Sequence, residues 1–144
     1  IPDTRFYHCN IKTLNLIPNV MAAQQASEAG CNETVFVRDG YVTECSHSNI
    51  SMVKDGVFIT HPLDNLILPG TERKHIIRWC GELGIPVKER AFTLEELYTA
   101  DEILVTSTSH PSMRAMELNQ KAVGMKNPEL IQKLRDKYLN EIGK

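Results

Sequence analysis

The sequence lacks the features that mark several large classes of protein. No apolar run approaches the roughly 20 residues that a helix needs to cross a bilayer, so no membrane association is expected. Neither sign of charge dominates, because 16 Lys and Arg stand against 18 Asp and Glu, and no basic patch indicates nucleic-acid binding. No internal repeat or low-complexity tract occurs. With 42% apolar residues, a single globular domain over residues 1–144 is expected.

Cysteine and histidine are present but without the spacing of a metal site or a disulfide framework. Cys9, Cys31, Cys45 and Cys80 form no CxxC pair, and we interpret them as reduced thiols of a cytoplasmic protein. A metal hydrolase would have to draw its ligands from these thiols and the five histidines, which are His8, His47, His61, His75 and His110. None of these residues shows ligand spacing on a recognisable helix or strand, so no metal site is expected.

The pattern of elements alternates between strands and helices, which favours an α/β or α+β domain. Asp39-Gly40 and Asp55-Gly56 separate β-branched runs and predict two hairpins. Thr93, with Glu96 three residues later, predicts a capped helix. Strands are expected at 5–12, 34–38, 41–45, 50–54, 57–60, 85–89, 102–107 and 113–118. Helices are expected at 19–29, 71–83, 93–98 and 129–142.

A single charged residue, Lys12, lies between Phe6 and Ser27, in the segment HCNIKTLNL. The neighbours look buried, and an unpaired ammonium is costly to bury. One interpretation is a lysine at a strand edge that reaches water. The other is a desolvated amine with a lowered pKa, which is nucleophilic and can form a Schiff base.

Other polar groups stand out in similar windows. Glu44 is the single charged residue in YVTECSHSNI. It is either a solvent-facing carboxylate at a strand end or a carboxylate that accepts a charged hydrogen bond from a ligand. The run VTSTS ends an apolar strand, either as an ordinary polar turn or as a phosphate cradle. The turn Leu68-Pro69-Gly70-Thr71 precedes a helix, whose N-terminus favours an anion. Together these groups supply an amine, a carboxylate and anion sites, which is what pyridoxal 5'-phosphate requires.

Four segments resemble those of fold-type IV pyridoxal-phosphate-dependent aminotransferases, in the family's order. HCNIKTLNLIPNV resembles the Schiff-base lysine segment D-I-K-S/T-L-N-L-L-x-N. VTECSHSNI resembles V-T-E-G-S-x-S-N, THPLDNLILPGTER resembles T-H-P-x-x-x-x-I-L-x-G-I-T-R, and VTSTS resembles T-S-T-T. The resemblance covers about residues 5 to 118 and is closest to the D-amino-acid transaminase branch. It implies a mixed sheet or pseudo-barrel with flanking helices, the large cofactor-binding domain of that fold.

The resemblance assigns the chemistry to particular residues. Lys12 would form the Schiff base and later shuttle a proton, Glu44 would contact the pyridine nitrogen, and Leu68 would pack on a ring face. The cofactor-binding set that it implies is Lys12, Glu44, Ser48, Asn49, Leu68, Gly70, Thr71, Glu72, Ser107 and Thr108. Backbone N–H groups near the start of the 71–83 helix and the Thr108 hydroxyl would hold the phosphate. Ser107 and Ser109 would lie on the substrate side.

Three departures from the family pattern bear on this site. Glu72 stands where the family often has Thr, so its carboxylate must point away from a bound phosphate or the hydroxyl contact is lost. Cys45 replaces a common Gly, so the turn there must tolerate a Cβ. His47 stands where a Ser can occur and is expected to support the site rather than to catalyse.

The family also has a smaller N-terminal domain, which supplies the substrate-carboxylate trap. The first residue is Ile1, and we expect this chain to be the large domain alone, poorly active without that part and homodimeric when complete. The expected reaction is transamination between a D-amino acid of the D-alanine type and a 2-oxo acid. Branched-chain aminotransferase, aminodeoxychorismate lyase and an inactive domain fragment are the alternatives.

Overall fold

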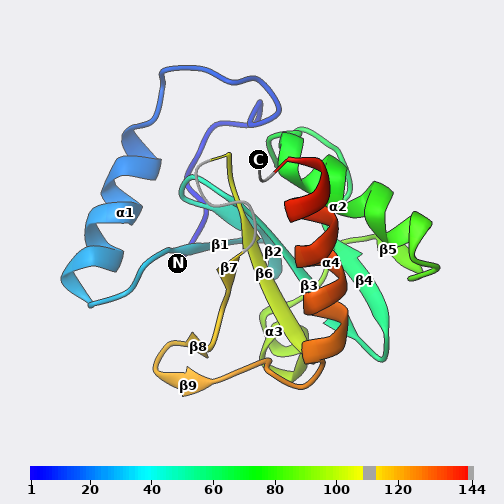
Figure 1. Ribbon diagram of the computed structural model, residues 1–144. Coiled ribbons are helices and arrows are strands. Elements are labelled where there is room, and N and C mark those ends of the chain that lie inside the picture. The colour runs from blue at the N-terminus through cyan, green and yellow to red at the C-terminus, as the bar shows by residue number, and fades with distance from the viewer. Residues whose placement is uncertain (109–112, 143–144) are drawn as a thin grey trace.

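The computed structural model describes residues 1–108 and 113–142 and has a mixed α/β architecture (Figure 1). Its centre is a five-stranded sheet in the order β5 (Val87–Glu89), β4 (Val57–Thr60), β3 (Asn49–Lys54), β6 (Glu102–Thr106) and β7 (Met113–Arg114). Only β4 and β5 pair in parallel, and the other neighbours are antiparallel. A separate hairpin joins β1 (Val35–Arg38) to β2 (Tyr41–Cys45).

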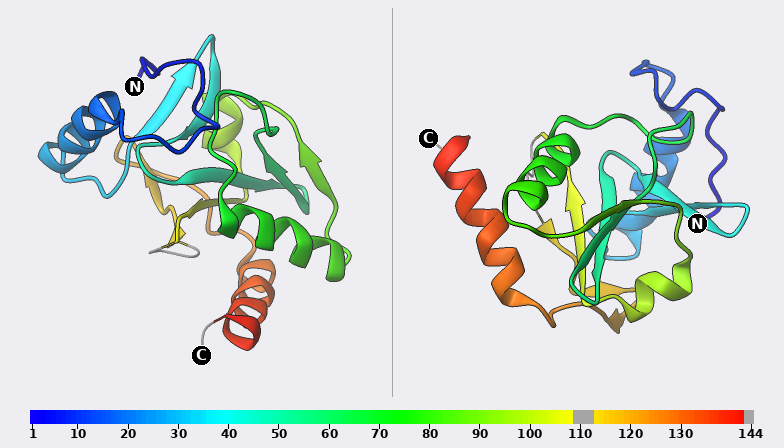
Figure 2. Two further views of the ribbon diagram at one scale, coloured as in Figure 1. Left: turned by 90° about the horizontal axis from the view of Figure 1, so that it is seen from above. Right: turned by 90° about the vertical axis from the view of Figure 1, so that its right-hand side faces the viewer.

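Helices cover the two faces of this sheet unequally. The helices α2 (Thr71–Glu82) and α4 (Pro128–Glu141) lie together on one face, while α1 (Ile17–Glu28) stands apart on the far side (Figures 1 and 2). The short helix α3 (Leu94–Thr99) closes one end of the sheet (Figure 1). None of the helices in the described residues is long and apolar enough to cross a membrane.

Alternation along the strands divides the core into two clusters, because successive strand residues face opposite sides of a sheet. Leu104 of β6 packs with Trp79 of α2 and Leu134 of α4. Its chain neighbours Ile103 and Val105 instead join the cluster under the β1–β2 hairpin and α3. The sheet is therefore the middle layer between a helical layer and the hairpin layer.

Most expected elements are present within a residue or two of their predicted bounds. Both Asp-Gly turns adopt the positive φ of tight hairpin turns, with Asp39 at 52° and Asp55 at 50°. The capping box forms as expected, since Thr93 accepts from the Glu96 N–H and Glu96 accepts from the Thr93 N–H. The helix that was expected at 19–29 spans Ile17–Glu28, with Pro18 in its first turn.

Two strand predictions are wrong. Residues 5–12 form an irregular segment, because its backbone bonds to another loop: the Cys9 N–H donates to the Asn65 carbonyl at 2.9 Å, and the Asn65 side chain donates to the Tyr7 carbonyl at 2.6 Å. The strand expected at 113–118 is divided into β7 and β8 (Glu117–Leu118). A short hairpin between β8 and β9 (Lys121–Ala122) was not anticipated.

Candidate functional site

The predicted site residues come together around one cavity of about 350 Å³. It lies where β2 ends, β3 begins, β6 ends and α2 begins. The pairing of β3 with β6 explains part of this convergence, because Asn49 is the register partner of Thr106. Every member of the predicted set lines the walls: Lys12, Glu44, Ser48, Asn49, Leu68, Gly70, Thr71, Glu72, Ser107 and Thr108.

Glu44 is buried, with 7% of its surface exposed, so it is not a solvent-facing carboxylate at a strand end. Its Oε1 accepts a short hydrogen bond and ion pair from the Arg5 guanidinium. Its Oε2 accepts from Asn49 Nδ2 at 3.0 Å and from the Leu68 backbone N–H at 3.0 Å. Glu44 is thus fixed in position by donors from three segments of the chain.

Burial raises the pKa of Glu44 above its ordinary value, and the charge of Arg5 and the Leu68 N–H oppose that rise. Arg5 is itself held by a second carboxylate, since its Nε and Nη2 donate to Asp3 at 2.9 and 2.8 Å. Burial also acts on Asp3, but the hydrogen bonds and charge of Arg5 outweigh it and lower the Asp3 pKa. The site therefore contains a buried carboxylate-arginine-carboxylate chain.

Sequence reasoning missed Arg5, which the structure places in the cavity wall. Arg5 directly precedes the uncharged window that drew attention to Lys12, so the window excluded it. The position of Arg5 at the edge of an uncharged run was the available signal. It does not reveal that Glu44, far along the chain, is the partner of Arg5.

Asn49 and Gly70 form a tightly packed pair at the cavity wall. Besides its bond to Glu44, Asn49 Nδ2 donates to the Leu68 carbonyl at 2.9 Å. A Cβ built on Gly70 would lie 2.1 Å from Asn49 Oδ1, which is far inside any real contact. Glycine at position 70 is therefore required by this side chain and not by its backbone, whose φ is −66°.

The N-terminus of α2 opens on the same cavity. Gly70 is its N-cap residue, and no side chain caps the helix, so the first-turn N–H groups remain for an anion. Two buried polar atoms near it, Glu72 Oε1 and Thr106 Oγ1, have no hydrogen-bond partner in the described residues. A buried polar atom without a partner is costly, and both residues line this cavity.

Lys12 lies at the mouth of the cavity and is exposed in this chain. The buried surroundings expected for it are absent. Neighbouring apolar side chains are exposed as well, including Ile11 at 56% and Leu14 at 97%. The physical reason is that no described segment packs over this stretch, which projects from the rest of the fold (Figure 2).

The turn that follows Glu44 is held by Glu33, another residue that sequence reasoning did not select. Glu33 accepts hydrogen bonds from Ser46 Oγ and, at 2.9 Å, from Ser48 Oγ, and its Oε2 is 2.9 Å from His47 Nδ1. Although burial opposes it, these bonds lower the Glu33 pKa. Ser48 is thereby turned toward Glu33, and His47 contacts this carboxylate at the cavity rim.

The hydroxyl-rich end of β6 contributes Thr106, Ser107 and Thr108 to the cavity. Thr108 is exposed and Ser107 half-buried, while Thr106 is buried. Ser109, expected on the substrate side, lies outside the described residues. Leu68 is half-buried and presents its backbone to Glu44 and Asn49.

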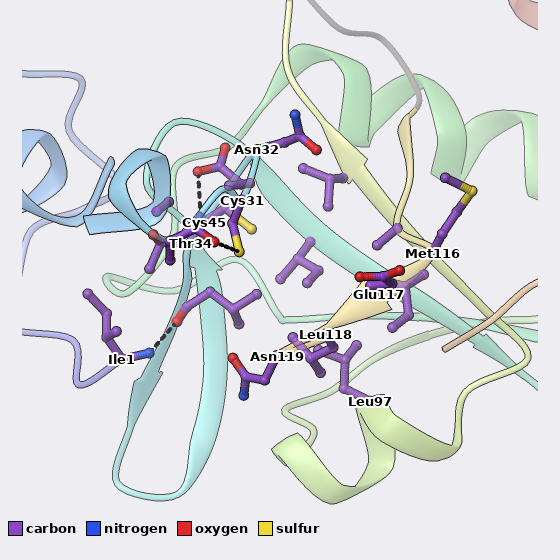
Figure 3. A pocket seen from close by; sticks show the side chains of 18 of the residues that line it. Ile1, Cys31, Asn32, Thr34, Cys45, Leu97, Met116, Glu117, Leu118 and Asn119 are labelled. Atoms are coloured by element: carbon purple, nitrogen blue, oxygen red, sulfur yellow. Dashed lines mark hydrogen bonds between the residues drawn. The ribbon is translucent and has the colours of Figure 1, made fainter. Parts of the chain in front are cut away.

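A second cavity, of about 470 Å³, is larger but has different chemistry (Figure 3). It lies between the β1–β2 hairpin and the β7–β8 segment, and its walls include core side chains such as Leu97 and Ile103. The amine in its wall is the N-terminal amino group of Ile1, which donates a hydrogen bond to the Val35 carbonyl at 2.8 Å. In residues 1–108 and 113–142 no group of three His, Cys, Asp or Glu side chains could hold a metal ion.

Comparison with known proteins gives consistent results. Residues 1–118 match the sequence model of the family Amino-transferase class IV. The chain is 43% identical over 142 residues to a D-alanine aminotransferase of Listeria monocytogenes. This match covers 97% of this chain and 49% of that protein. A D-alanine aminotransferase of Bacillus licheniformis is 37% identical over 147 residues, with 99% of this chain and 52% of the relative covered.

Solved structures extend the comparison to the fold. The branched-chain amino acid aminotransferase of Thermobaculum terrenum, solved in its PLP form, superposes with a TM-score of 0.84 at 27% identity. That match covers 91% of this chain and 44% of the other. This chain therefore spans about half the length of the curated relatives that it matches.

Proposed function

This chain belongs to the family Amino-transferase class IV, and we propose that it is the cofactor-binding part of an enzyme that moves an amino group between a D-amino acid and a 2-oxo acid. The single observation that carries this proposal is the cavity that gathers Lys12, Glu44 and the N-terminus of α2. The D-alanine aminotransferases among its relatives support D-alanine as the donor. Pyridoxal 5'-phosphate is the proposed cofactor.

The residues present fit that cofactor. Its aldehyde needs an amine, which Lys12 offers, and its ring nitrogen needs a buried acid, which Glu44 offers. Its phosphate needs donors, which the uncapped first turn of α2 and the Thr108 hydroxyl offer. The unpartnered Thr106 Oγ1 supports the presence of a polar ligand here. When bound, the cofactor supplies an electron sink for the bonds at the substrate α-carbon.

Glu44 would hold a proton on the cofactor's ring nitrogen by hydrogen bonding to it. Its carboxylate is fixed by Arg5 and Asn49, so it cannot turn away to solvent. Arg5 opposes the rise in the Glu44 pKa, which keeps the carboxylate available as an acceptor for a protonated ring nitrogen. Glu44 therefore acts as a pre-positioned charge and not as a proton carrier.

Lys12 would hold the cofactor through a Schiff base at Nζ and, once displaced by substrate, move a proton at the same atom. The segment that carries Lys12 is tied down nearby, through the Cys9 N–H at the Asn65 carbonyl, which would hold the amine at the cavity mouth. Exposure of Lys12 in this chain indicates that further protein is needed to exclude water from the amine.

We propose that an N-terminal domain of the same enzyme is the cover, because the chain spans about half the length of its relatives. Large apolar side chains are exposed around the cavity mouth and along α1, namely Ile11, Leu14, Leu16, Ile17, Val20 and Met21. Such a contiguous apolar surface marks an interaction site. We infer that it packs against the N-terminal domain and a second subunit in a homodimer. The free thiols of all four cysteines support a cytoplasmic location.

The structural comparison supports a second reaction within the same fold less strongly than the D-alanine reaction. The Thermobaculum terrenum protein is a branched-chain amino acid aminotransferase, and the matched 44% of its chain has the same fold. Aminodeoxychorismate lyase chemistry would use the same lysine and ring. We propose that the residues that decide among these substrates lie in the part of the enzyme that would hold the substrate carboxylate, outside this chain.

The half-reaction with each enantiomer of alanine tests the proposed function. The chain is joined to the N-terminal half of the Listeria monocytogenes relative, loaded with pyridoxal 5'-phosphate and mixed with D- or L-alanine. We expect one equivalent of pyruvate and of pyridoxamine 5'-phosphate with D-alanine only, and none in the Lys12→Ala variant. Lys88→Ala, which removes an exposed amine outside the cavity, is the matched control and should react normally. Turnover of L-leucine in place of D-alanine would contradict the D-amino-acid assignment.

A further inference from the structure

Glu72 is an unusual group to find beside an anion site. It is the second residue of α2, in the first turn, where N–H groups point toward the cavity. Its side chain does not project into solvent: Glu72 is only 8% exposed, and it lines the cavity. Its Oε1 has no hydrogen-bond partner within the described part of the chain.

The ionised form of Glu72 is poorly supported in this position. Burial raises its pKa above the ordinary value, and no charged partner counters that effect. Its chain neighbour Arg73 is engaged elsewhere, since it donates to the His61 carbonyl at 2.8 Å and to Glu89 at 2.7 Å. The helix N-terminus favours a negative charge, but it would favour the charge of a bound anion equally.

Within the described residues, Glu72 is unpaired with any of the other titratable groups that line the cavity, which are Arg5, Cys9, Lys12, Glu44, the buried Cys45 and His47. Arg5 and Glu44 pair with each other, and His47 contacts Glu33. Cys9 donates to the Phe6 carbonyl at 3.1 Å, and Lys12 is exposed at the mouth. None of these groups forms an ion pair or a hydrogen bond with Glu72 in residues 1–108 and 113–142.

A doubly charged anion at the start of α2 would place like charge beside this carboxylate. Repulsion disfavours the carboxylate, whereas the neutral acid has an O–H that an anion oxygen can accept. We propose that Glu72 binds the anion as the neutral carboxylic acid, donating its O–H to an anion oxygen, so that filling this site takes up a proton. The proposal rests on the proposed function, because the phosphate of the cofactor would be the natural anion.

The consequence is a cofactor-phosphate site whose affinity depends on pH through one protein side chain. Below the Glu72 pKa the acid is already protonated and binding takes up no proton. Above it each bound anion must recruit one proton, so the affinity falls by about tenfold for each pH unit. A residue with a permanent O–H or N–H donor at position 72 would bind without this dependence.

Sulfate is the probe that isolates Glu72, because it stays a dianion across the working range and forms no Schiff base. Sulfate is titrated into the purified chain between pH 5 and pH 8 in two buffers of different ionisation enthalpy, which gives the number of protons taken up. Backbone amide shifts at residues 70–72 locate the binding. We expect proton uptake and a falling affinity in the wild type, and neither in Glu72→Gln.

Glu129→Gln is the matched control, because Glu129 is also a first-turn glutamate, of α4, but is exposed. It should behave as the wild type. Glu72→Thr provides a second non-titrating donor if the Gln variant is poorly folded. Sulfate binding without proton uptake, unshifted amides at residues 70–72, or an unchanged pH dependence in both variants would overturn the proposal. Formation of a cofactor adduct on Lys12 is measured separately, so the proposed function can stand when this inference fails.

Discussion

Replacing Gly70 by alanine tests whether the cavity wall is as tightly built as the structure shows. The new Cβ would lie 2.1 Å from Asn49 Oδ1, so the amide oxygen must retreat by about 1.3 Å to reach ordinary contact. The backbone itself accepts alanine, since Gly70 has φ −66° and ψ 138°. Any cost must therefore come from moving Asn49.

Asn49 cannot move without losing its two hydrogen bonds, to Glu44 Oε2 at 3.0 Å and to the Leu68 carbonyl at 2.9 Å. Each buried bond lost costs about 1–2 kcal/mol, with the bond to the carboxylate at the upper end. Gly70→Ala should therefore lower the free energy of unfolding by about 2–4 kcal/mol. It should also weaken cofactor binding, because Glu44 loses one of its fixed donors.

Urea unfolding at pH 7 measures the change, and Gly81→Ala is the matched control. Gly81 lies in the same helix and has open space around its Cβ position, so alanine there should stabilise the chain by about 0.5–1 kcal/mol. In the background of Asn49→Ala, the Gly70→Ala substitution should cost almost nothing further. A Gly70→Ala variant with wild-type stability and wild-type cofactor affinity would refute this reasoning.

Further predictions concern charge, pH and packing. Arg5→Ala leaves Glu44 and Asp3 buried without their common partner and should destabilise the fold by about 3–5 kcal/mol, as measured by urea unfolding. Folding lowers the Asp3 pKa, so the contribution of Asp3 to the free energy of unfolding is complete above its unfolded pKa and is lost as the pH falls through its folded pKa. A free energy of unfolding that stays constant between pH 5 and pH 2 would contradict this. Folding raises the Glu72 pKa, so stability falls as pH rises from the unfolded to the folded pKa, and Glu72→Gln should gain stability over the wild type at pH 8 but not at pH 4. Leu134→Ala removes a side chain that is 2% exposed between α4 and α2, and thermal or urea unfolding should show a loss of about 2–5 kcal/mol.

Local signals in the sequence were enough to predict most of the fold. The Asp-Gly turns and the Thr93–Glu96 capping box depend on residues that are close in the chain, and both features form. The wrong strand at 5–12 shows the limit of such signals. That segment has strand-like residues, but its backbone groups bond to the 61–70 loop, which no local pattern reveals.

The candidate site was found by residue type and motif, while its internal contacts were not. Lys12, Glu44 and the turn before α2 were selected because each is chemically unusual in its window. Arg5 and Glu33 were missed because their roles depend on contacts across 39 and 13 positions, with Glu44 and Ser46. Lys12 was expected among buried neighbours, but no described segment of this chain packs over it, and its local sequence does not reveal that exposure.

We propose above all that Lys12 holds pyridoxal 5'-phosphate in the cavity that Glu44 and α2 form. The most direct measurement is to add the cofactor to the purified chain, reduce with borohydride and map the modified residue by mass spectrometry. We expect one adduct on Lys12, absent in Lys12→Ala and retained in Lys88→Ala. Adducts spread over the surface lysines in the chain and also in the protein rejoined to an N-terminal half would contradict it.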